Sequence, residues 1–280
     1  MSWTNYDITI SISKMRTKTQ PNVFFPLEFT KRNFKREKLY LSKRSNMDLS
    51  HLHPTEINNI AVKQMESGDI DGAIATFTVA VRASKQLMVK SRDEEEDLKT
   101  QDGTSDEQKL DNLMRISHPD NDSMDCREEM AQDQCYMYRR AIQVTEDDIE
   151  DDYESRIVLS VVILFNLALS NHLSAEMEDD ETRKSLKLRK AAKLYEMTYN
   201  LHQDASIGLN PLFLLATVNN LGVIYQTMNQ QETAQELFRT LLSTILFLTD
   251  CGEGKVVSEF GGFFQNVSGF IFSECTAAAA

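Results

Sequence analysis

The sequence has few cysteines, and none is placed as a metal ligand would be. Its 280 residues include Cys126, Cys135, Cys251 and Cys275, which form no Cys-x-x-Cys pair and have no cluster of histidines around them. This spacing excludes the common zinc motifs and gives little support to a disulfide framework. We therefore expect a protein of a reducing compartment, with no metal site and no cofactor.

Long apolar runs are also missing. The longest apolar stretch, from Ile157 to Ala168, covers about a dozen residues and is interrupted by Ser160 and Asn166. A helix that crosses a bilayer needs about 20 apolar residues, and the amino-terminal residues lack the apolar core of a secretory signal. We expect a soluble, cytoplasmic protein that has no membrane partner.

Enzymatic motifs are absent or incomplete. The run CGEGKVV resembles a phosphate-binding loop, but Thr249 stands where its first glycine belongs and Val256 where its hydroxyl belongs. An acidic run that resembles a calcium loop has Ala131 in place of the bidentate glutamate. His51 and His53 lack a third ligand nearby, so we interpret them as a solvated pair. We expect no catalytic residues and no enzymatic activity.

Charge divides the chain into three parts. The net charge is −13, but residues 1–50 carry ten basic and four acidic side chains, whereas residues 92–155 carry seven and 22. Within the acidic stretch, residues 92–133 are also poor in aromatic residues, which favours disorder. We predict a basic irregular leader at 1–53, a first helical hairpin at 54–91, an acidic disordered insert at 92–133, and two further hairpins with a terminal helix at 134–280.

The leader has several possible roles. Its basic side chains, which extend from Lys31 to Arg44, are typical of a solvated tail, of a nuclear import signal or of a nucleic-acid contact. A nuclear location is therefore the alternative to a cytoplasmic one. Met47 is an alternative start, because the helical pattern begins shortly after it.

Two distant stretches share one helical spacing. Small and aromatic residues follow one another at intervals of 12, 4 and 3 residues in both stretches, at Ala61, Ala73, Phe77 and Ala80, and again at Gly222, Ala234, Phe238 and Leu241. Such stripes predict amphipathic helices. A break at Gly68-Asp69 in the first stretch and a start at Asn210-Pro211 in the second predict antiparallel hairpins. Asn229 with Glu232 predicts the cap of the last helix.

A third hairpin is present in broken form. Ala191, Tyr195 and Thr198 match the second-helix positions, and Ala168 matches the first-helix position. The step from Ala168 to Ala191 is 23 residues instead of 12, so we expect about 11 extra residues in the turn, among them an acidic run at 176–181.

This spacing resembles the tetratricopeptide repeat (TPR), a helix-turn-helix unit of 34 residues. The runs FNLALSNHL, NNLGVIY and LLSTILFLTDCG also resemble uncharacterised TPR-like proteins from algae. The usual first-helix tryptophan is replaced by Ile57, Leu164 and Val218, and the closing proline is missing. The resemblance implies an all-α solenoid of about three hairpins.

Two further segments complete the expected fold. Residues Val256, Phe260, Phe263, Val267 and Phe270 form a helical stripe, which predicts a C-terminal capping helix. For residues 135–144 the sequence predicts a short extended segment that lies against the helices.

Asparagine recurs at one position of all three hairpins, at Asn59, Asn166 and Asn220. In the TPR family this position faces the concave groove, so the resemblance implies that these amides bind the backbone of an extended peptide. The alternative is a local bond within each helix. The other groove positions in the same register are Asn58, Val62, Met65, Phe165, Leu169, His172, Asn219, Val223 and Gln226.

The favoured function is a non-enzymatic scaffold or adaptor that binds an extended or helical peptide segment of a protein partner in a TPR-like groove. The alternative is a nucleic-acid-associated regulator that uses the basic leader, although we do not expect nucleic acid to be the main partner. The sequence leaves the partner's identity and the oligomeric state open.

Overall fold

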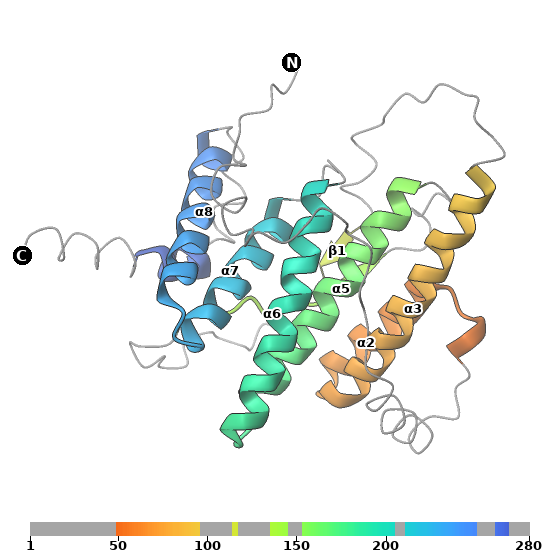
Figure 1. Ribbon diagram of the computed structural model, residues 1–280, viewed down its shortest axis with the longest axis horizontal. Coiled ribbons are helices and arrows are strands. Elements are labelled where there is room, and N and C mark those ends of the chain that lie inside the picture. The colour runs from red at the N-terminus through yellow and green to blue at the C-terminus, as the bar shows by residue number, and fades with distance from the viewer. Residues whose placement is uncertain are drawn as a thin grey trace, which may run out of the picture.

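The structure, a computed structural model, is predominantly helical, as the sequence predicts (Figure 1). Among the described residues the only β structure is an antiparallel pair formed by β1 (Met114–Ile116) and β2 (Ile142–Val144). The predicted basic leader lies outside the described residues as far as position 48. The structure describes residues 49–95, 114–116, 135–144, 153–204, 211–250 and 261–268.

Six helices form three antiparallel pairs that follow the order of the chain. The pairs are α2 (Pro54–Glu66) with α3 (Ile70–Glu95), α5 (Tyr153–Glu176) with α6 (Glu181–Asp204), and α7 (Pro211–Thr227) with α8 (Gln231–Asp250). Because α3 also packs against α5, and α6 against α7, the pairs form one continuous row (Figure 1). A short 3₁₀ helix, η3 (Leu49–His51), precedes α2, and residues 261–268 form a further helical segment.

Local signals fix the ends of the first pair. The backbone N–H of His53 donates to Glu56 over 2.8 Å, which completes a capping box at the start of α2. His53, which the sequence suggested as one of a solvated pair, is exposed and also caps this helix. Gly68 adopts a φ of 84° and ends the helix, and the Asp69 carboxylate accepts from Gly72 N, as the predicted break requires.

The long loop expected between the helices of the second pair does not form. Both α5 and α6 have 24 residues, and only residues 177–180 connect them. The extra residues lengthen the helices because the stretch after Glu181 is rich in lysine, arginine and leucine, which are good helix formers. The acidic side chains therefore surround a tight tip instead of a long turn.

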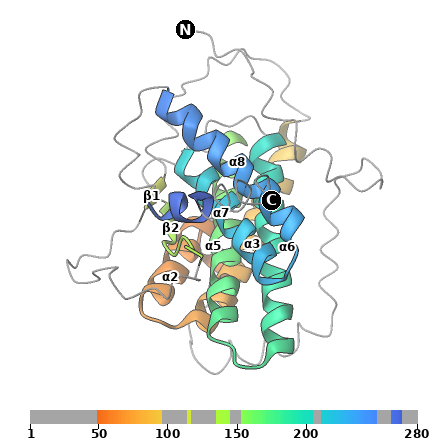
Figure 2. The ribbon, with the colours of Figure 1, turned by 90° about the vertical axis from the view of Figure 1, so that its left-hand side faces the viewer.

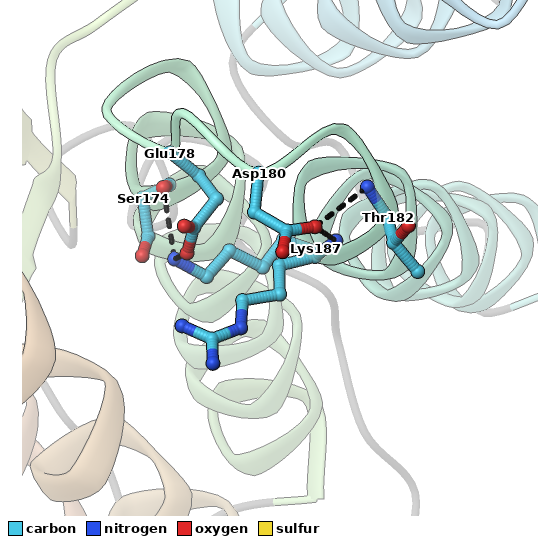
Figure 3. A network of polar contacts seen from close by, with 6 residues as sticks. Ser174, Glu178, Asp180, Thr182 and Lys187 are labelled. Carbon is cyan, nitrogen blue, oxygen red and sulfur yellow. Dashed lines mark hydrogen bonds and ion pairs between the residues drawn. The ribbon is translucent and has the colours of Figure 1, made fainter.

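Polar contacts close this tip (Figure 3). The Asp180 carboxylate accepts from the backbone N–H of Thr182 over 2.9 Å and so caps α6. The ammonium of Lys187 donates to Glu178 over 2.7 Å and to the backbone carbonyl of Ser174 over 3.2 Å. Lys187 thus connects the last turns of α5 to the first turns of α6.

The small and aromatic positions meet between helices. Phe77, Tyr195 and Phe238 are all buried. Gly222 lies against Phe238 so closely that an added Cβ would be 2.7 Å from a ring carbon. The missing side chain of Gly222 therefore lets α7 and α8 approach each other closely.

Three further sequence predictions need correction. Asn229 has a φ of 61° and ends α7 instead of capping α8, which begins at Gln231. The first hairpin extends past residue 91, because α3 runs to Glu95. Residues Met114–Ile116, which fall in the predicted disordered insert, form β1, because the edge of β2 offers them backbone partners. The other residues of that insert beyond 95 and before 134 lie outside the described residues.

We expect Gly222→Ala to lower the free energy of unfolding by about 1 kcal/mol. Overpacking against Phe238 costs about 1–3 kcal/mol, and the higher helix propensity of alanine offsets about 1 kcal/mol of this. Gly261→Ala is the matched control, because an added Cβ there meets nothing within 4 Å. Urea unfolding of both variants checks the prediction, and equal stabilities would contradict it.

Candidate functional site

Residues 135–144, which we call the resident segment, run in extended form along the helices. Figure 2 shows β2, the end of this segment, beside α2 and α5. Its apolar side chains at Met137, Tyr138 and Ile142 are buried. The expectation that this stretch lies extended against the helices is confirmed. Its backbone has no helix to satisfy it, so its N–H and C=O groups need other partners.

Four asparagines supply these partners, and we call them the asparagine ladder. They are Asn59 on α2, Asn166 on α5, Asn220 on α7 and Asn266 in the helix at 261–268. Each of them accepts from the N–H and donates to the C=O of one resident residue. The four residues held in this way are Tyr136, Tyr138, Ile142 and Val144.

The ladder bonds are short and regular. Asn220 accepts from Tyr138 N over 2.8 Å and donates to its carbonyl over 2.9 Å. Asn166 makes the same two bonds to Ile142 over 2.9 and 2.7 Å. In a strand, the N–H and C=O of one residue point to the same side, as in the hydrogen-bonded pair of an antiparallel ladder. Each asparagine amide therefore takes the place of a residue on a neighbouring strand.

The two outer rungs repeat this geometry. Asn59 accepts from Val144 N over 3.0 Å and donates to its carbonyl over 2.7 Å. Asn266 accepts from Tyr136 N over 2.8 Å and donates to its carbonyl over 2.7 Å. The amino end of the segment thus lies at helix 261–268 and the carboxyl end at α2, opposite to the order of the hairpins in the chain.

Additional amides hold the ladder in place. Asn58 donates to the carbonyl of Ile142 and accepts from Asn166 over 2.9 Å. Asn219 donates to the carbonyl of Tyr136 and accepts from Asn266 over 2.7 Å. Because both groups of an amide must be paired when buried, these contacts fix the orientation of each ladder side chain.

Aromatic side chains surround the amino half of the segment. The Tyr138 ring stacks on Phe263 with centroids 6.1 Å apart and lies 6.3 Å from Phe165. The Tyr136 ring meets Phe263 edge-on at 5.4 Å. Gly262 leaves room for Tyr136, because an added Cβ there would lie 2.3 Å from the ring. The glycine that weakens this terminal helix thus allows the tyrosine to pack against it.

Polar side chains make two further contacts. Arg139, which is exposed, forms an ion pair of 2.8 Å with Glu176 at the end of α5. Burial raises the pKa of Glu176, and the charge of Arg139 opposes this shift. Cys135 donates to Gln226 over 3.1 Å, and burial raises the pKa of its thiol. Of the two arginines in the segment, Arg139 and Arg140, the first is therefore matched by a negative side chain.

His172 is buried beside the segment as a neutral side chain. Burial, and to a smaller degree the charge of Arg139, lower its pKa to about 3. Its ring lies 6.3 Å from Tyr195, and its Nδ1 has no hydrogen-bond partner among the described residues. Burial also raises the pKa of Tyr195, whose hydroxyl accepts from Asn220.

Apart from His172, the predicted groove residues either contact the resident segment or pack elsewhere. Those that contact the resident segment through hydrogen bonds or ring contacts are Asn58, Asn59, Phe165, Asn166, Asn219, Asn220 and Gln226. Val62, Leu169 and Val223 are buried in the hydrophobic core. Met65 is half-buried, and its sulfur accepts from Ser170.

Asn266 and Glu176 were not among the predicted site residues. The sequence does carry a signal for Asn266, because every ladder asparagine is followed by an aliphatic and then a small residue. The four tripeptides are Asn59-Ile60-Ala61, Asn166-Leu167-Ala168, Asn220-Leu221-Gly222 and Asn266-Val267-Ser268. No comparable pattern marks Glu176, whose contact with Arg139 depends on the path of the segment.

Comparison with known proteins gives no match to a family model, a curated protein or a solved structure. Among the described residues, no group of three histidine, cysteine, aspartate or glutamate side chains is arranged to hold a metal ion. One described helix, Glu154–Glu176 within α5, is long and apolar enough to cross a membrane, but 89% of its most apolar part is buried by the other helices.

We expect Asn166→Ala to destabilise the protein by about 1–3 kcal/mol, because it leaves the buried N–H of Ile142 without its partner. Asn171→Ala is the matched control. Asn171 is also buried, but among the described residues its amide donates to the carbonyl of Leu167 in its own helix and not to the resident segment. Urea unfolding and hydrogen exchange at Ile142 measure the effect, and equal losses in the two variants would contradict this role of Asn166.

We expect His172 to make the protein sensitive to acid. Its folded pKa of about 3 lies below the unfolded value of 6.5, so the unfolded chain binds a proton that the folded chain excludes. Stability is therefore lost as pH falls below 6.5, by about 2 kcal/mol at pH 5. His172→Gln should remove this part of the loss. Unfolding at pH 7.5 and 5 in both proteins tests this, and parallel pH profiles would contradict it.

Proposed function

We propose that the protein is a non-enzymatic scaffold whose TPR-like hairpins bind an extended peptide by its main chain. In this proposal, three hairpins and a C-terminal capping helix form a solenoid with the asparagine ladder on its inner wall. The observation that carries the proposal is the pairing of four asparagine amides with both backbone groups of four residues of one extended segment.

Main-chain recognition explains why amides occupy these positions. An asparagine amide offers a donor and an acceptor together, whereas a charged side chain offers only one kind of group. Backbone groups are the same in every peptide, so the ladder fixes the extended conformation without selecting a sequence. The proposed binding residues are those of the ladder, together with Asn58, Val62, Phe165, Leu169, His172, Asn219, Val223 and Gln226.

The helix at 261–268 supports the capping role. Phe263 and Val267, from the predicted apolar stripe, are buried, while Val256, Phe260 and Phe270 lie outside the described residues. Asn266 on the same helix extends the ladder by one rung. In our proposal this helix therefore closes the end of the row and also binds the peptide.

The chemistry of the inner wall supports binding instead of catalysis. Apart from Glu176 at its edge, the described side chains that contact the segment are amides and apolar groups, and the buried imidazole of His172 is neutral above a pH of about 3. The alternative, a regulator that binds nucleic acid, depends on the basic leader, which lies outside the described residues up to position 48. A protein or peptide partner remains the proposal, as does a cytoplasmic location.

Peptide display against the full-length protein tests the proposed function. We expect random peptides of about a dozen residues to be enriched. When Asn220→Ala is added to a Tyr138→Ala protein, whose resident segment is weakened, their affinity should fall by about tenfold or more, because the bound peptide loses the partner of one buried main-chain pair. Asn171→Ala added to the same protein is the matched control and should leave the affinity unchanged. A selection without enriched peptides, or one whose peptides bind both variants equally, would contradict the proposal.

A further inference from the structure

The resident segment already occupies the ladder, and its side chains show which chemistry fits there. Tyr138 lies between Phe165 and Phe263, and Arg139 points to Glu176. Ala141 and Ile142, three and four residues after the tyrosine, are buried. These contacts involve side chains, so they add sequence selectivity to a ladder that reads only the backbone.

We infer that the partner is an extended peptide that binds by displacing the resident segment. This peptide carries an aromatic residue and an arginine directly after it. It also carries a pair of small or aliphatic residues three and four positions after the aromatic one. This inference rests on the proposed function. The amino end of the bound peptide lies at helix 261–268 and its carboxyl end at α2.

The aromatic position is the most demanding one. Tyr138 is buried, and its ring meets one ring from α5 and another from the terminal helix. Aromatic pairs prefer such stacked or tilted arrangements, which a small side chain cannot make. A peptide with alanine at this position leaves the space between Phe165 and Phe263 unfilled.

The arginine position sets the charge preference. The side chains of Arg139 and Glu176 are 62% and 36% exposed, so this ion pair lies at the open edge of the site. Exposed pairs add little affinity, but like charges placed together suppress wrong partners. An acidic residue after the aromatic one would face Glu176 and be repelled.

Displacement is feasible because the exchange is symmetrical. An incoming peptide makes the same eight backbone bonds to the ladder that the resident residues make. The resident segment has one advantage, since a tethered ligand acts at an effective concentration on the order of millimolar. A free peptide therefore binds the wild-type protein weakly, and it binds more tightly when the resident segment is weakened.

A labelled peptide of residues 134–146 tests the inference on the full-length protein by fluorescence anisotropy. We expect it to bind the Tyr138→Ala protein at least about tenfold more tightly than the wild type, because the weakened resident segment competes less. Hydrogen exchange at Ile142 and Val144 of the resident segment should increase when the peptide is added. If Tyr138→Ala does not fold by circular dichroism, the Arg139→Glu protein replaces it, because that side chain is exposed.

Peptide variants test the two side-chain positions. In the peptide, Tyr138→Ala and Arg139→Glu should each lower the affinity by about fivefold or more. When Glu176→Arg is added to the protein used in this assay, the protein should regain affinity for the Arg139→Glu peptide, because the charges are then reversed on both sides.

The outcomes separate this inference from the proposed function. If all peptides bind the Tyr138→Ala protein equally well and lose affinity when Asn220→Ala is added to it, main-chain binding stands and the side-chain chemistry is overturned. If the peptide binds without increasing exchange of the resident amides, displacement is overturned. If no folded variant binds the peptide, the inference fails, and the display selection decides about the proposed function by itself.

Discussion

The structure depends on one constraint, which is that a buried extended backbone must find hydrogen-bond partners. The resident segment passes between helices whose own N–H and C=O groups are already paired within each helix. Beyond the backbone of β1, which pairs with β2, side chains supply the donors and acceptors. Each ladder asparagine does this for a whole residue at once, and an unmade bond would cost about 1–3 kcal/mol.

The helical row determines where these side chains lie. One asparagine from each hairpin, and one from the terminal helix, reaches the same segment because α2, α5, α7 and residues 261–268 follow one another beside it. The helix α5 is central to this arrangement, since it packs against α3 and α6 and also contacts β2. Its near-complete burial explains why its sequence is apolar on almost every side.

The same geometry connects structure with the proposed binding activity. Backbone pairing fixes an extended conformation and a direction, and the aromatic and charged contacts around Tyr138 and Arg139 add preference for particular side chains. In the proposed function, a segment of the same chain that satisfies both requirements competes with any partner. The affinity of a partner for this protein would then depend on how well that partner replaces the resident segment.

Much of the architecture was predictable from the sequence. The intervals between Ala61, Ala73 and Phe77 recur near the C-terminus, where Gly222 makes room for the ring of Phe238. Gly68 and Pro211 marked helix ends because their backbone preferences are local. The lengths of α5 and α6 were not predictable from the repeat spacing, because helix propensity in the inserted residues overrode the expected loop.

The sequence by itself therefore determined the helices, their pairing in hairpins and the recurrence of asparagine at Asn59, Asn166 and Asn220. Only the tertiary structure decided that these amides hold a segment of the same chain, with Asn266 as a further rung and Glu176 opposite Arg139. The physical reason is the separation along the sequence of the residues that interact. Helix formation depends on neighbours a few residues apart, whereas the bond between Asn59 and Val144 joins groups 85 positions apart and forms only after the hairpins have packed.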